Sequence, residues 1–367
     1  MPRSLAVESL VIRGFRNLTS VDLELGHRFN VLSGDNGQGK TNLIEAVYVL
    51  ATSRSFRTSK VGELVTAGSD AAGIRGRVRE DDASREQSVM LRPGTRAVRI
   101  DGKRPTTLAT YALRTPTVVF HPGAVTLTAG GGTERRRLLD RISLYQSAAA
   151  QADTEGYAKA MRARQRVLEA RGEMARDLDG WEELAVVHGL AMSEARASAA
   201  GALIPAARRA FTRIGQPDLA LDARYERSAP RTVEAFRSEL ARRRSQDRAR
   251  RSATIGPHRD DVVLALGGRP MRGMASQGQH RAAVLALKLA EIEVVAVARG
   301  VRPVLLLDDV SSELDRERTA ALFTALQDEP SQVLLTTTRP ELIDTRALSG
   351  VDTRRDFVVV EGRISPS

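Results

Sequence analysis

The sequence predicts an α/β protein with a mixed sheet that a mostly helical insertion divides into two parts. Short, almost wholly apolar segments at residues 29–32 and 304–307 are typical of strands in a parallel sheet covered on both faces. Between them, residues 136–251 are rich in Ala, Arg, Glu and Leu and poor in Gly and Pro, which favours amphipathic helices. We therefore predict a split domain of residues 1–135 and 252–367, with residues 136–251 as a short helical arm.

The elements of the split domain follow from periodicity and turn signals. Apolar and acidic residues alternate in 21–25, which is the period of a half-buried strand. Arg92-Pro93-Gly94 predicts a turn between antiparallel strands within 74–101. The mostly apolar run 43–50 predicts a buried helix. The other predicted elements are strands at residues 5–12, 29–32, 117–120, 262–266, 304–307, 333–335 and 357–360, a helix at 279–297, and arm helices broken near Pro205, Gly215, Pro217 and Pro230.

The charge balance indicates a polyanionic partner. The net charge is +11 and the sequence pI is about 10.6, and a strongly basic protein favours nucleic acid or an acidic membrane surface. The predicted arm alone has 23 basic and 16 acidic residues. Only five of the 56 basic residues are Lys, so a compositional bias toward Arg remains an alternative explanation of the charge.

The sequence excludes several classes of protein and site. The chain has no Cys, which rules out disulfides, thiolate metal sites and Cys nucleophiles. It has no run of about 18 apolar residues, so we expect no membrane-spanning helix and no membrane partner. Residues 1–17 carry four charges and no apolar core, unlike a signal peptide. We therefore expect a cytoplasmic protein.

Residues 34–41 read GDNGQGKT and match the phosphate-binding pattern G-x-x-x-x-G-K-[ST] between a predicted strand and a predicted helix. The glycines allow successive N–H groups to turn toward phosphate oxygens, and the helix N-terminus adds positive potential. Lys40 would bind the β- and γ-phosphates of ATP, and the Thr41 hydroxyl would ligate Mg²⁺. The predicted ATP-binding residues of this segment are Gly34, Asp35, Asn36, Gly37, Gln38, Gly39, Lys40, Thr41 and Asn42.

An acidic pair follows the apolar strand at residues 304–307. Asp308 is predicted to lie beside the phosphates and to hold Mg²⁺. Asp309 would point elsewhere and orient or deprotonate an attacking water, which makes Lys40 and Asp309 the predicted catalytic residues. By itself an Asp-Asp pair could also cap a helix or lie in a solvated loop, so this prediction depends on the phosphate-binding segment.

Residues 275–281 read ASQGQHR before an apolar helix, 32 residues ahead of the acidic pair. A Ser-x-Gly-Gln in this order resembles the signature of ABC-type ATPases, although Ser-x-Gly is common at helix N-termini. In that superfamily the signature meets the nucleotide held by a second subunit. The resemblance implies an ATP-dependent homodimer in which Ser276, Gly278 and Gln279 act in trans. Residues 312–315 resemble the D-loop, which crosses the same interface.

Further segments narrow the resemblance. RGFRNL, ATSRSFRTSK, VVFHPGAVTL with ERRRLLD, GPHRDD and LLLDDVSSELD together resemble the RecF family of bacterial recombination mediators, from about residue 5 to residue 360. The resemblance implies a P-loop ABC-type ATPase head with a mixed sheet and an inserted mostly helical lobe. It also implies slow ATP hydrolysis, binding of DNA near gaps and junctions, and work with RecO and RecR in loading RecA.

Three positions depart from the ABC pattern. Asp309 stands where Glu is usual, and a shorter carboxylate is consistent with slow turnover. Thr338 stands where a switch His is usual, and His121 lies about where the Q-loop Gln is expected. These departures leave the Q-loop residue unassigned.

DNA binding is expected to be mainly to duplex. Arg side chains that contact backbone phosphates give affinity without reading sequence, and the aromatic content of 4% offers little for stacking on single strands. The candidate contacts are Arg135, Arg136, Arg137, Arg162, Arg164, Arg166, Arg208, Arg209, Arg242, Arg243 and Arg244.

Several alternatives stay open at the level of sequence. Arg13, Arg16 and Arg57 could each reach the nucleotide or serve the structure, and His258 is expected to be packed rather than catalytic. The chain could also be another SMC-like ABC ATPase of DNA metabolism, a transporter nucleotide subunit, or a scaffold that ATP organises without a required hydrolysis cycle. A nuclease is disfavoured, because no extra cluster of Asp, Glu and His suggests a second metal site.

Overall fold

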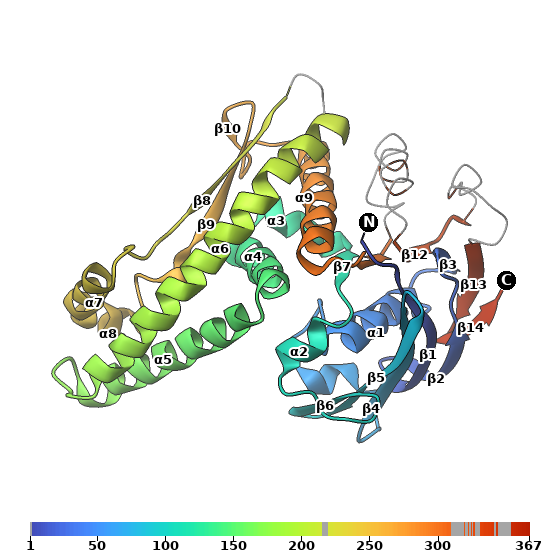
Figure 1. Ribbon diagram of the computed structural model, residues 1–367, viewed down its shortest axis with the longest axis horizontal. Coiled ribbons are helices and arrows are strands. Elements are labelled where there is room, and N and C mark those ends of the chain that lie inside the picture. The colour runs from blue at the N-terminus through green and yellow to red at the C-terminus, as the bar shows by residue number, and fades with distance from the viewer. Residues whose placement is uncertain are drawn as a thin grey trace. The chain divides into compact units, whose positions relative to one another are not determined.

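Packing divides the chain into two compact units. The head unit is Met1–Ala124 with Glu291–Ser367, and the arm unit is Val125–Ala290. Figure 1 shows the elements of both units. The computed structural model describes residues 2–214, 219–309, 331–340 and 354–367, and the single positions 319, 322, 324, 326 and 343.

A six-stranded mixed sheet forms one layer of the head unit. Its strands, in spatial order, are β14 (Arg363–Pro366), β13 (Arg354–Val360), β3 (Phe29–Ser33), β12 (Val333–Thr337), β11 (Val304–Leu307) and β7 (Thr117–Phe120). The strands from β13 to β7 are parallel, and β14 is antiparallel to β13. β3, β12, β11 and β7 are buried along nearly their whole length, which explains why their sequences are mostly apolar runs without alternation.

A five-stranded antiparallel sheet forms a second layer of the head unit. Its strands, in spatial order, are β2 (Leu18–Glu24), β1 (Leu5–Phe15), β4 (Ala72–Glu80), β5 (Ala83–Arg92) and β6 (Thr95–Ile100). Buried and exposed residues alternate along β4, as expected when one face of a sheet meets the core. The predicted turn lies at Pro93-Gly94, between β5 and β6.

Helix α1 (Lys40–Thr52) joins these two layers, because it contacts strands of both sheets. Its apolar side chains, among them Leu43, Val47 and Leu50, belong to one core with side chains of both sheets. Figure 1 shows α1 behind the five-stranded sheet. The head unit also contains the short helices η1 (Val61–Leu64) and α2 (Leu108–Ala112).

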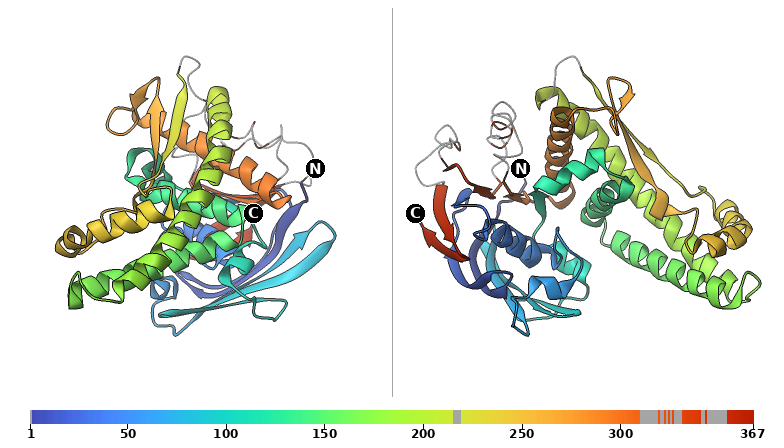
Figure 2. Two further views of the ribbon diagram at one scale, coloured as in Figure 1. Left: turned by 60° about the vertical axis from the view of Figure 1, so that its left-hand side comes forward. Right: turned by 180° about the vertical axis from the view of Figure 1, so that it is seen from behind.

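The arm unit is built on a helical hairpin. Helices α5 (Ala149–Arg171) and α6 (Leu178–Ile214) run side by side in Figures 1 and 2. Helices α4 (Gly132–Gln146), α7 (Val233–Arg242) and α8 (Arg244–Arg250) pack against this hairpin, and α3 (Thr126–Ala129) contacts α4. The short helix η3 (Pro257–Arg259) also lies in this unit, whereas η2 (Pro122–Val125) ends at its first residue. A three-stranded antiparallel sheet has the order β10 (Arg269–Pro270), β9 (Asp261–Leu266) and β8 (Leu221–Glu226).

Two features of the arm differ from the sequence prediction. β8 was not predicted, although its apolar Leu221, Ala223 and Tyr225 alternate with charged residues. The predicted break at Pro205 is wrong, because Pro205 lies inside the 37-residue helix α6. A proline removes the hydrogen bond to the carbonyl four residues earlier, here that of Gly201. Both residues are exposed, so water can satisfy that carbonyl while the buried face of α6 continues.

The division between the units differs from the predicted domain boundaries. It assigns residues 125–135 and 252–290 to the arm unit, because β9 pairs with β8 along its whole length and Arg135 binds both carboxylate oxygens of Asp261 at 2.7 and 2.8 Å. The predicted boundaries concern which segments make up the ATPase domain, and they stay a prediction.

The division falls inside the last long helix of the described chain, α9 (Gln277–Arg299). This helix was predicted at residues 279–297 and begins two residues earlier. No helix in the described parts of the chain combines the length and apolar character needed to cross a bilayer.

Candidate nucleotide-binding site

The loop between β3 and α1 contains the predicted phosphate-binding residues. β3 lies between β13 and β12, so the loop leaves the interior of the sheet. Gly34 has a φ of 146°, and a Cβ there would lie 2.4 Å from the carbonyl oxygen of Val359. Gly39 has a φ of 114°, and a Cβ there would lie 2.8 Å from the side-chain oxygen of Asn17. Only glycine meets both demands, so packing and backbone conformation dictate these two positions.

Helix α1 begins at this loop without a side-chain cap. Its N-cap residue is Gly39, and its first turn has no acidic residue. Asn36 and Gly37 are exposed in the loop. The first N–H groups of a helix have no intrahelical partner, and the helix dipole adds positive potential there. This end of α1 is therefore suited to bind an anion such as phosphate.

Lys40 is the first residue of α1, and its side chain turns back over the loop. Nζ donates hydrogen bonds to the carbonyl oxygens of Gly34 at 2.5 Å and Asp35 at 2.7 Å. Burial lowers the pKa of Lys40, while the carboxylates of Asp309, Asp35 and Asp308 act in the opposite direction. The ammonium group is therefore held at the loop with the acidic pair nearby.

Thr41 and Asp308 meet at the carboxyl ends of the parallel strands. Thr41 Oγ1 donates a hydrogen bond to Asp308 Oδ1 at 2.8 Å. Two oxygen ligands in adjacent positions of an octahedral Mg²⁺ site, at 2.0–2.1 Å from the ion, lie about 2.9 Å apart. Burial raises the pKa of Asp308, and hydrogen bonds from Thr41 and Thr336 oppose this shift. The residue types, their spacing and a buried carboxylate all fit a magnesium ion.

Asp309 has an unusual backbone conformation, with a φ of 53°. Few residues other than glycine adopt this region, although Asp tolerates it better than most. Its N–H donates to Thr336 Oγ1 at 2.8 Å. Of the carboxylates that oppose the lowering of the pKa of Lys40, Asp309 has the largest effect. Strained backbone of this kind is often found at functional sites, and here it comes directly after Asp308, the residue that follows β11.

Glu45 is a buried carboxylate of α1 that binds two arginines. Arg16 donates to its two oxygens at 2.9 and 3.0 Å, and Arg57 donates to one of them at 3.1 Å. Ser55 Oγ donates to Glu45 at 2.5 Å, and Arg57 also donates to Asn42 Oδ1 at 2.8 Å. Two of the three arginines whose role the sequence leaves open, Arg16 and Arg57, thus have a structural partner in Glu45. In the sequence only the family resemblance pointed to this cluster, through the segments RGFRNL and ATSRSFRTSK.

Gln38 and Asn42 attach the loop to the rest of the head unit. Asn42 Nδ2 donates to Asn17 Oδ1 at 2.8 Å. Gln38 Oε1 accepts from the Glu361 N–H at 2.6 Å, and its carbonyl oxygen accepts from the Gly362 N–H at 2.8 Å. The turn between β13 and β14 therefore supports the loop, a contact that no sequence signal predicts.

Arg13 and His258, whose roles the sequence also leaves undecided, have structural partners as well. The guanidinium of Arg13 donates to Asp22 at 2.7 Å and to the Val21 carbonyl oxygen at 2.9 Å. His258 is half-buried, and its Nδ1 lies 2.7 Å from the Tyr157 hydroxyl while Nε2 lies 3.1 Å from the Ala253 carbonyl oxygen. Burial lowers the pKa of His258. Both ring nitrogens have partners, so His258 is a packed histidine, as expected.

Two of the positions that depart from the ABC pattern lie near the carboxyl ends of strands. His121 directly follows β7, and its ring centre lies 5.0 Å from that of Phe56. Thr338 is exposed just beyond β12. The hydroxyl that reaches the acidic pair is instead that of Thr336, which donates to Asp308 Oδ1 at 3.0 Å.

Ser276 and Gln279 form a reciprocal cap at the start of α9. Ser276 Oγ accepts from the Gln279 N–H at 3.2 Å, and Gln279 Oε1 accepts from the Ser276 N–H at 2.8 Å, which is a capping box. The Ser276 hydroxyl can still donate its proton, and the first turn, with Gly278, has no acidic residue. These residues belong to the arm unit, whereas residues 34–41 belong to the head unit. The predicted D-loop, residues 312–315, lies outside the described residues.

The structure sorts the arginines that were predicted to contact DNA. Arg164 is fully buried and binds Glu182 at 2.9 Å and Asp247 at 2.7 Å, so its prediction as a DNA contact is wrong. A buried guanidinium needs carboxylate partners of this kind. Other candidates with acidic partners are Arg135 with Asp261, Arg137 with Glu134, Arg208 with Asp222, Arg242 and Arg243 with Glu239, and Arg244 with Glu182 and Asp179.

Arg162 and Arg166 remain as exposed candidates on the arm. Both are exposed on α5, and neither has a hydrogen bond or ion pair with another described residue. Lys159 is exposed one turn earlier on the same helix. Residues spaced by three and four lie on one face of a helix, so these three side chains form a basic stripe.

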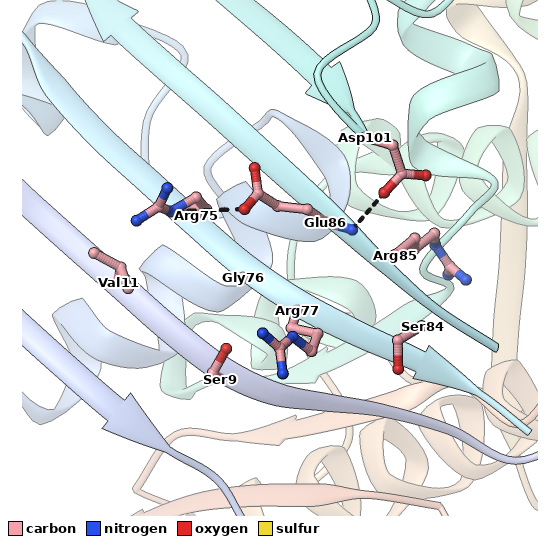
Figure 3. A pocket seen from close by; sticks show the side chains of 9 residues that line it. All are labelled: Ser9, Val11, Arg75, Gly76, Arg77, Ser84, Arg85, Glu86 and Asp101. Atoms are coloured by element: carbon pink, nitrogen blue, oxygen red, sulfur yellow. Dashed lines mark hydrogen bonds and ion pairs between the residues drawn. The ribbon is translucent and has the colours of Figure 1, made fainter. Parts of the chain in front are cut away.

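A cavity of about 490 Å³ lies on the five-stranded sheet. Figure 3 shows the lining side chains, which come from β1, β4 and β5 and include Asp101. Arg75 approaches Glu86 to 3.9 Å, and Asp101 accepts from the Glu86 N–H at 2.8 Å. The lining residues include no member of residues 34–41 or the acidic pair, so the cavity is separate from the candidate nucleotide site.

Comparison with known proteins gives the family. The model of the RecF/RecN/SMC N terminal domain matches residues 6–358. The DNA replication and repair protein RecF of Anaeromyxobacter sp. (strain Fw109-5) is 39% identical over 369 residues, which cover 98% of each chain. The chain belongs to the RecF family. RecF of Geobacter sp. (strain M21) is 35% identical and covers 97% of this chain and 98% of its own.

Solved structures agree with the RecF assignment. A structure described as the recombination mediator protein RecF with ATP in the RecFOR pathway has a TM-score of 0.87 and 28% identity, and covers 100% of this chain and 99% of its own. An Smc head domain from Pyrococcus yayanosii has a TM-score of 0.58 at 13% identity and covers 99% of this chain and 97% of its own. At this low identity the comparison supports a shared fold and no shared function. The predicted fold class, an ABC-type head with a mixed sheet and an inserted mostly helical lobe, is confirmed.

Proposed function

We propose that this protein is an ATP-dependent, DNA-binding recombination mediator with slow ATPase activity. The observation that carries the proposal is the hydrogen bond between Thr41 and Asp308, which brings the phosphate-binding loop and the acidic pair together in a RecF-family chain. A RecF structure with ATP at 28% identity supports ATP as the nucleotide.

Nucleotide binding would use groups that the loop already presents. The uncapped N–H groups at the start of α1 would bind the β-phosphate, and Lys40 would exchange its hydrogen bonds to the loop carbonyls for bonds to phosphate oxygens. Thr41 and Asp308 would hold Mg²⁺, which neutralises charge on the phosphates. Because Lys40 is largely buried, its charge acts on the phosphate with little screening by water.

Hydrolysis would depend on Asp309, the member of the acidic pair that is not proposed as a ligand of Mg²⁺. Its carboxylate would orient or deprotonate the attacking water. An Asp side chain is one methylene shorter than the Glu usual in ABC ATPases, so the carboxylate would hold the water less closely. We therefore expect slow turnover.

Dimerisation would use the start of α9. Ser276 and Gly278 lie at a helix N-terminus that is already ordered by the capping box with Gln279. A γ-phosphate held by a second copy would accept hydrogen bonds from this terminus, so that ATP becomes part of the interface between two subunits.

Replacing Ser276 with arginine is expected to block dimerisation while leaving ATP binding intact. The long side chain would occupy the space of the partner's phosphate, whereas residues 34–41 are unchanged. The mass of the ATP-bound protein, measured by light scattering, should stay that of a monomer. Thr232→Arg is the matched control, because Thr232 is the exposed N-cap residue of α7. Its replacement also removes a side-chain cap, at a cost of about 1 kcal/mol of stability. A normal ATP-induced dimer of S276R would exclude the role in trans.

Duplex DNA would bind the basic stripe of Lys159, Arg162 and Arg166. Removing both arginines with alanine is expected to weaken duplex binding and to reduce the slope of log affinity against log salt by about 1 for each lost contact. Fluorescence anisotropy over a salt series measures both quantities. Arg237→Ala is the control, because this exposed arginine is paired with Glu183. An unchanged affinity and salt slope in the double variant would place the DNA contacts on other residues.

Within the cell, the same cycle would serve RecA loading with RecO and RecR at gaps and junctions. The RecFOR pathway in the description of the related ATP-bound structure supports the part of this proposal that concerns RecO and RecR. The most direct test measures ATPase rate and oligomer mass with and without gapped duplex DNA. We expect an ATP-dependent dimer whose hydrolysis is stimulated by DNA. A monomer that binds no ATP, or turnover that DNA leaves unchanged, would contradict the proposal.

A further inference from the structure

Thr336 lies at the carboxyl end of β12, beside the acidic pair. β12 pairs with β11 through Leu335 and Leu307, so Thr336 is level with the residue that follows β11, Asp308. On its other side β12 pairs with β3, the strand that leads into the phosphate-binding loop. Thr336 is 2% exposed, so its hydroxyl needs partners within the protein.

The Thr336 hydroxyl makes two hydrogen bonds of different kinds. It donates to Asp308 Oδ1 at 3.0 Å and accepts from the Asp309 N–H at 2.8 Å. A hydroxyl has one proton to donate and two lone pairs that accept, so both bonds form at once. One side chain thus contacts the carboxylate of one acidic residue and the backbone of the next.

These two contacts have separate consequences. Asp308 Oδ1 accepts a hydrogen bond from Thr41, in the first turn of α1, and another from Thr336, on the sheet. Thr41 belongs to the phosphate-binding motif, whereas Thr336 lies outside it. Asp309 has the left-handed backbone with a φ of 53°, which is unfavourable for a residue with a side chain. The hydrogen bond to its N–H helps to hold that conformation.

We propose that Thr336 is a positioning residue that sets both members of the acidic pair. It orients the Asp308 carboxylate for the metal ion and holds the backbone from which the Asp309 carboxylate extends. Thr336 would not touch the nucleotide. This inference rests on the proposed ATPase function of the same site.

The test compares Thr336→Val, Thr336→Ala and Thr336→Ser. Valine keeps the shape and replaces the hydroxyl with a methyl group. Alanine loses both the hydroxyl and the methyl group, and serine loses only the methyl group. Thr117→Val is the matched control, because Thr117 is a fully buried threonine of the same sheet that donates to the Thr115 carbonyl at 2.9 Å. Thr117 begins β7 and pairs with Val304, the first residue of β11, so it lies at the other end of the parallel strands from the acidic pair.

Two readouts separate positioning from general structure. Binding of Mn²⁺ to the complex with a non-hydrolysable ATP analogue is followed by electron paramagnetic resonance, and kcat and KM for ATP are measured in parallel. We expect the valine and alanine variants to lose about 10–100-fold in Mn²⁺ affinity and in kcat. Nucleotide affinity without metal should stay at the wild-type value, and T336S and T117V should behave like the wild type.

Wild-type Mn²⁺ affinity in T336V and T336A would overturn the inference. It would also be overturned if T336S were as impaired as T336V, or if T117V lost metal affinity to the same extent. If T336V does not fold, T336A and T336S alone decide. A wild-type protein that binds no nucleotide analogue would instead contradict the proposed function itself, so the two failures are distinguishable.

Discussion

Replacing Lys40 with alanine is expected to abolish ATP binding. Lys40 is the one lysine of the loop, and its buried ammonium group would make at least two charge-assisted hydrogen bonds to phosphate oxygens. Such bonds contribute about 1.5–3 kcal/mol each, so their loss corresponds to at least about a 100-fold weaker affinity. Calorimetric titration with ATP and Mg²⁺ measures the change.

Lys60→Ala is the matched control for this variant. Lys60 is exposed and contacts Glu63 at 3.4 Å, so its removal should leave affinity unchanged. Lys40 also holds the carbonyl oxygens of Gly34 and Asp35, and circular dichroism should therefore verify that the K40A head is folded. Wild-type affinity in a folded K40A protein would refute the assignment of the phosphate-binding loop.

Replacing Arg164 with alanine is expected to destabilise the arm unit by about 3–5 kcal/mol. Its guanidinium is fully buried between Glu182 and Asp247, which are themselves buried, and it also donates to the Leu240 carbonyl at 2.8 Å. Without it, two carboxylates would remain in the interior with less compensation. Urea unfolding measures the total change, and hydrogen exchange should show the loss of protection in α5 and α6.

Arg166→Ala provides the comparison, since it changes the same residue type two positions further along α5. Arg166 is exposed and has no partner among the described residues, so its removal should cost no more than about 0.5 kcal/mol. Equal stability of the two variants would show that the buried network is dispensable. The pair also separates stability from DNA binding, because only R166A is expected to lower affinity for duplex while the arm stays folded.

The fold was accessible from sequence because the signals in the head are local. The apolar run at residues 304–307 corresponds to β11 residue for residue, since a strand covered on both faces needs apolar side chains at every position. The glycines at 34 and 39 follow from close approaches to Val359 and Asn17. Turn chemistry at Pro93-Gly94 likewise depends on a few adjacent residues.

The elements that escaped prediction depend on partners far along the chain. β8 is a strand because β9 pairs with it. Its alternating pattern is only six residues long and lies in a mostly helical region, so the pattern alone does not predict a strand. Pro205 predicts a break, yet α6 continues through it because residues on both sides of the proline are buried. Tertiary contacts overrode local propensity in both cases.

In the candidate site, too, contacts between residues far apart in the chain could not be predicted from the sequence. Lys40, Thr41 and Asp308 belong to motifs with fixed spacing, and their roles remain predictions that the variants above can test. Thr336 belongs to no motif, because its contact with Asp308 exists only through the pairing of β12 with β11. Arg164 looked like its exposed neighbours on α5, and only the position of Asp247, 83 residues later, reveals that it is buried.

The order of strands in the six-stranded sheet has a consequence for synthesis on the ribosome. β3, which leads into the phosphate-binding loop, is flanked by β12 and β13 from the last part of the described chain. A nascent polypeptide that has completed β3 and α1 still lacks both neighbouring strands and the acidic pair. The emerging protein should therefore gain nucleotide affinity only after translation has passed β13, which leaves its early segments dependent on other contacts or on chaperones until then.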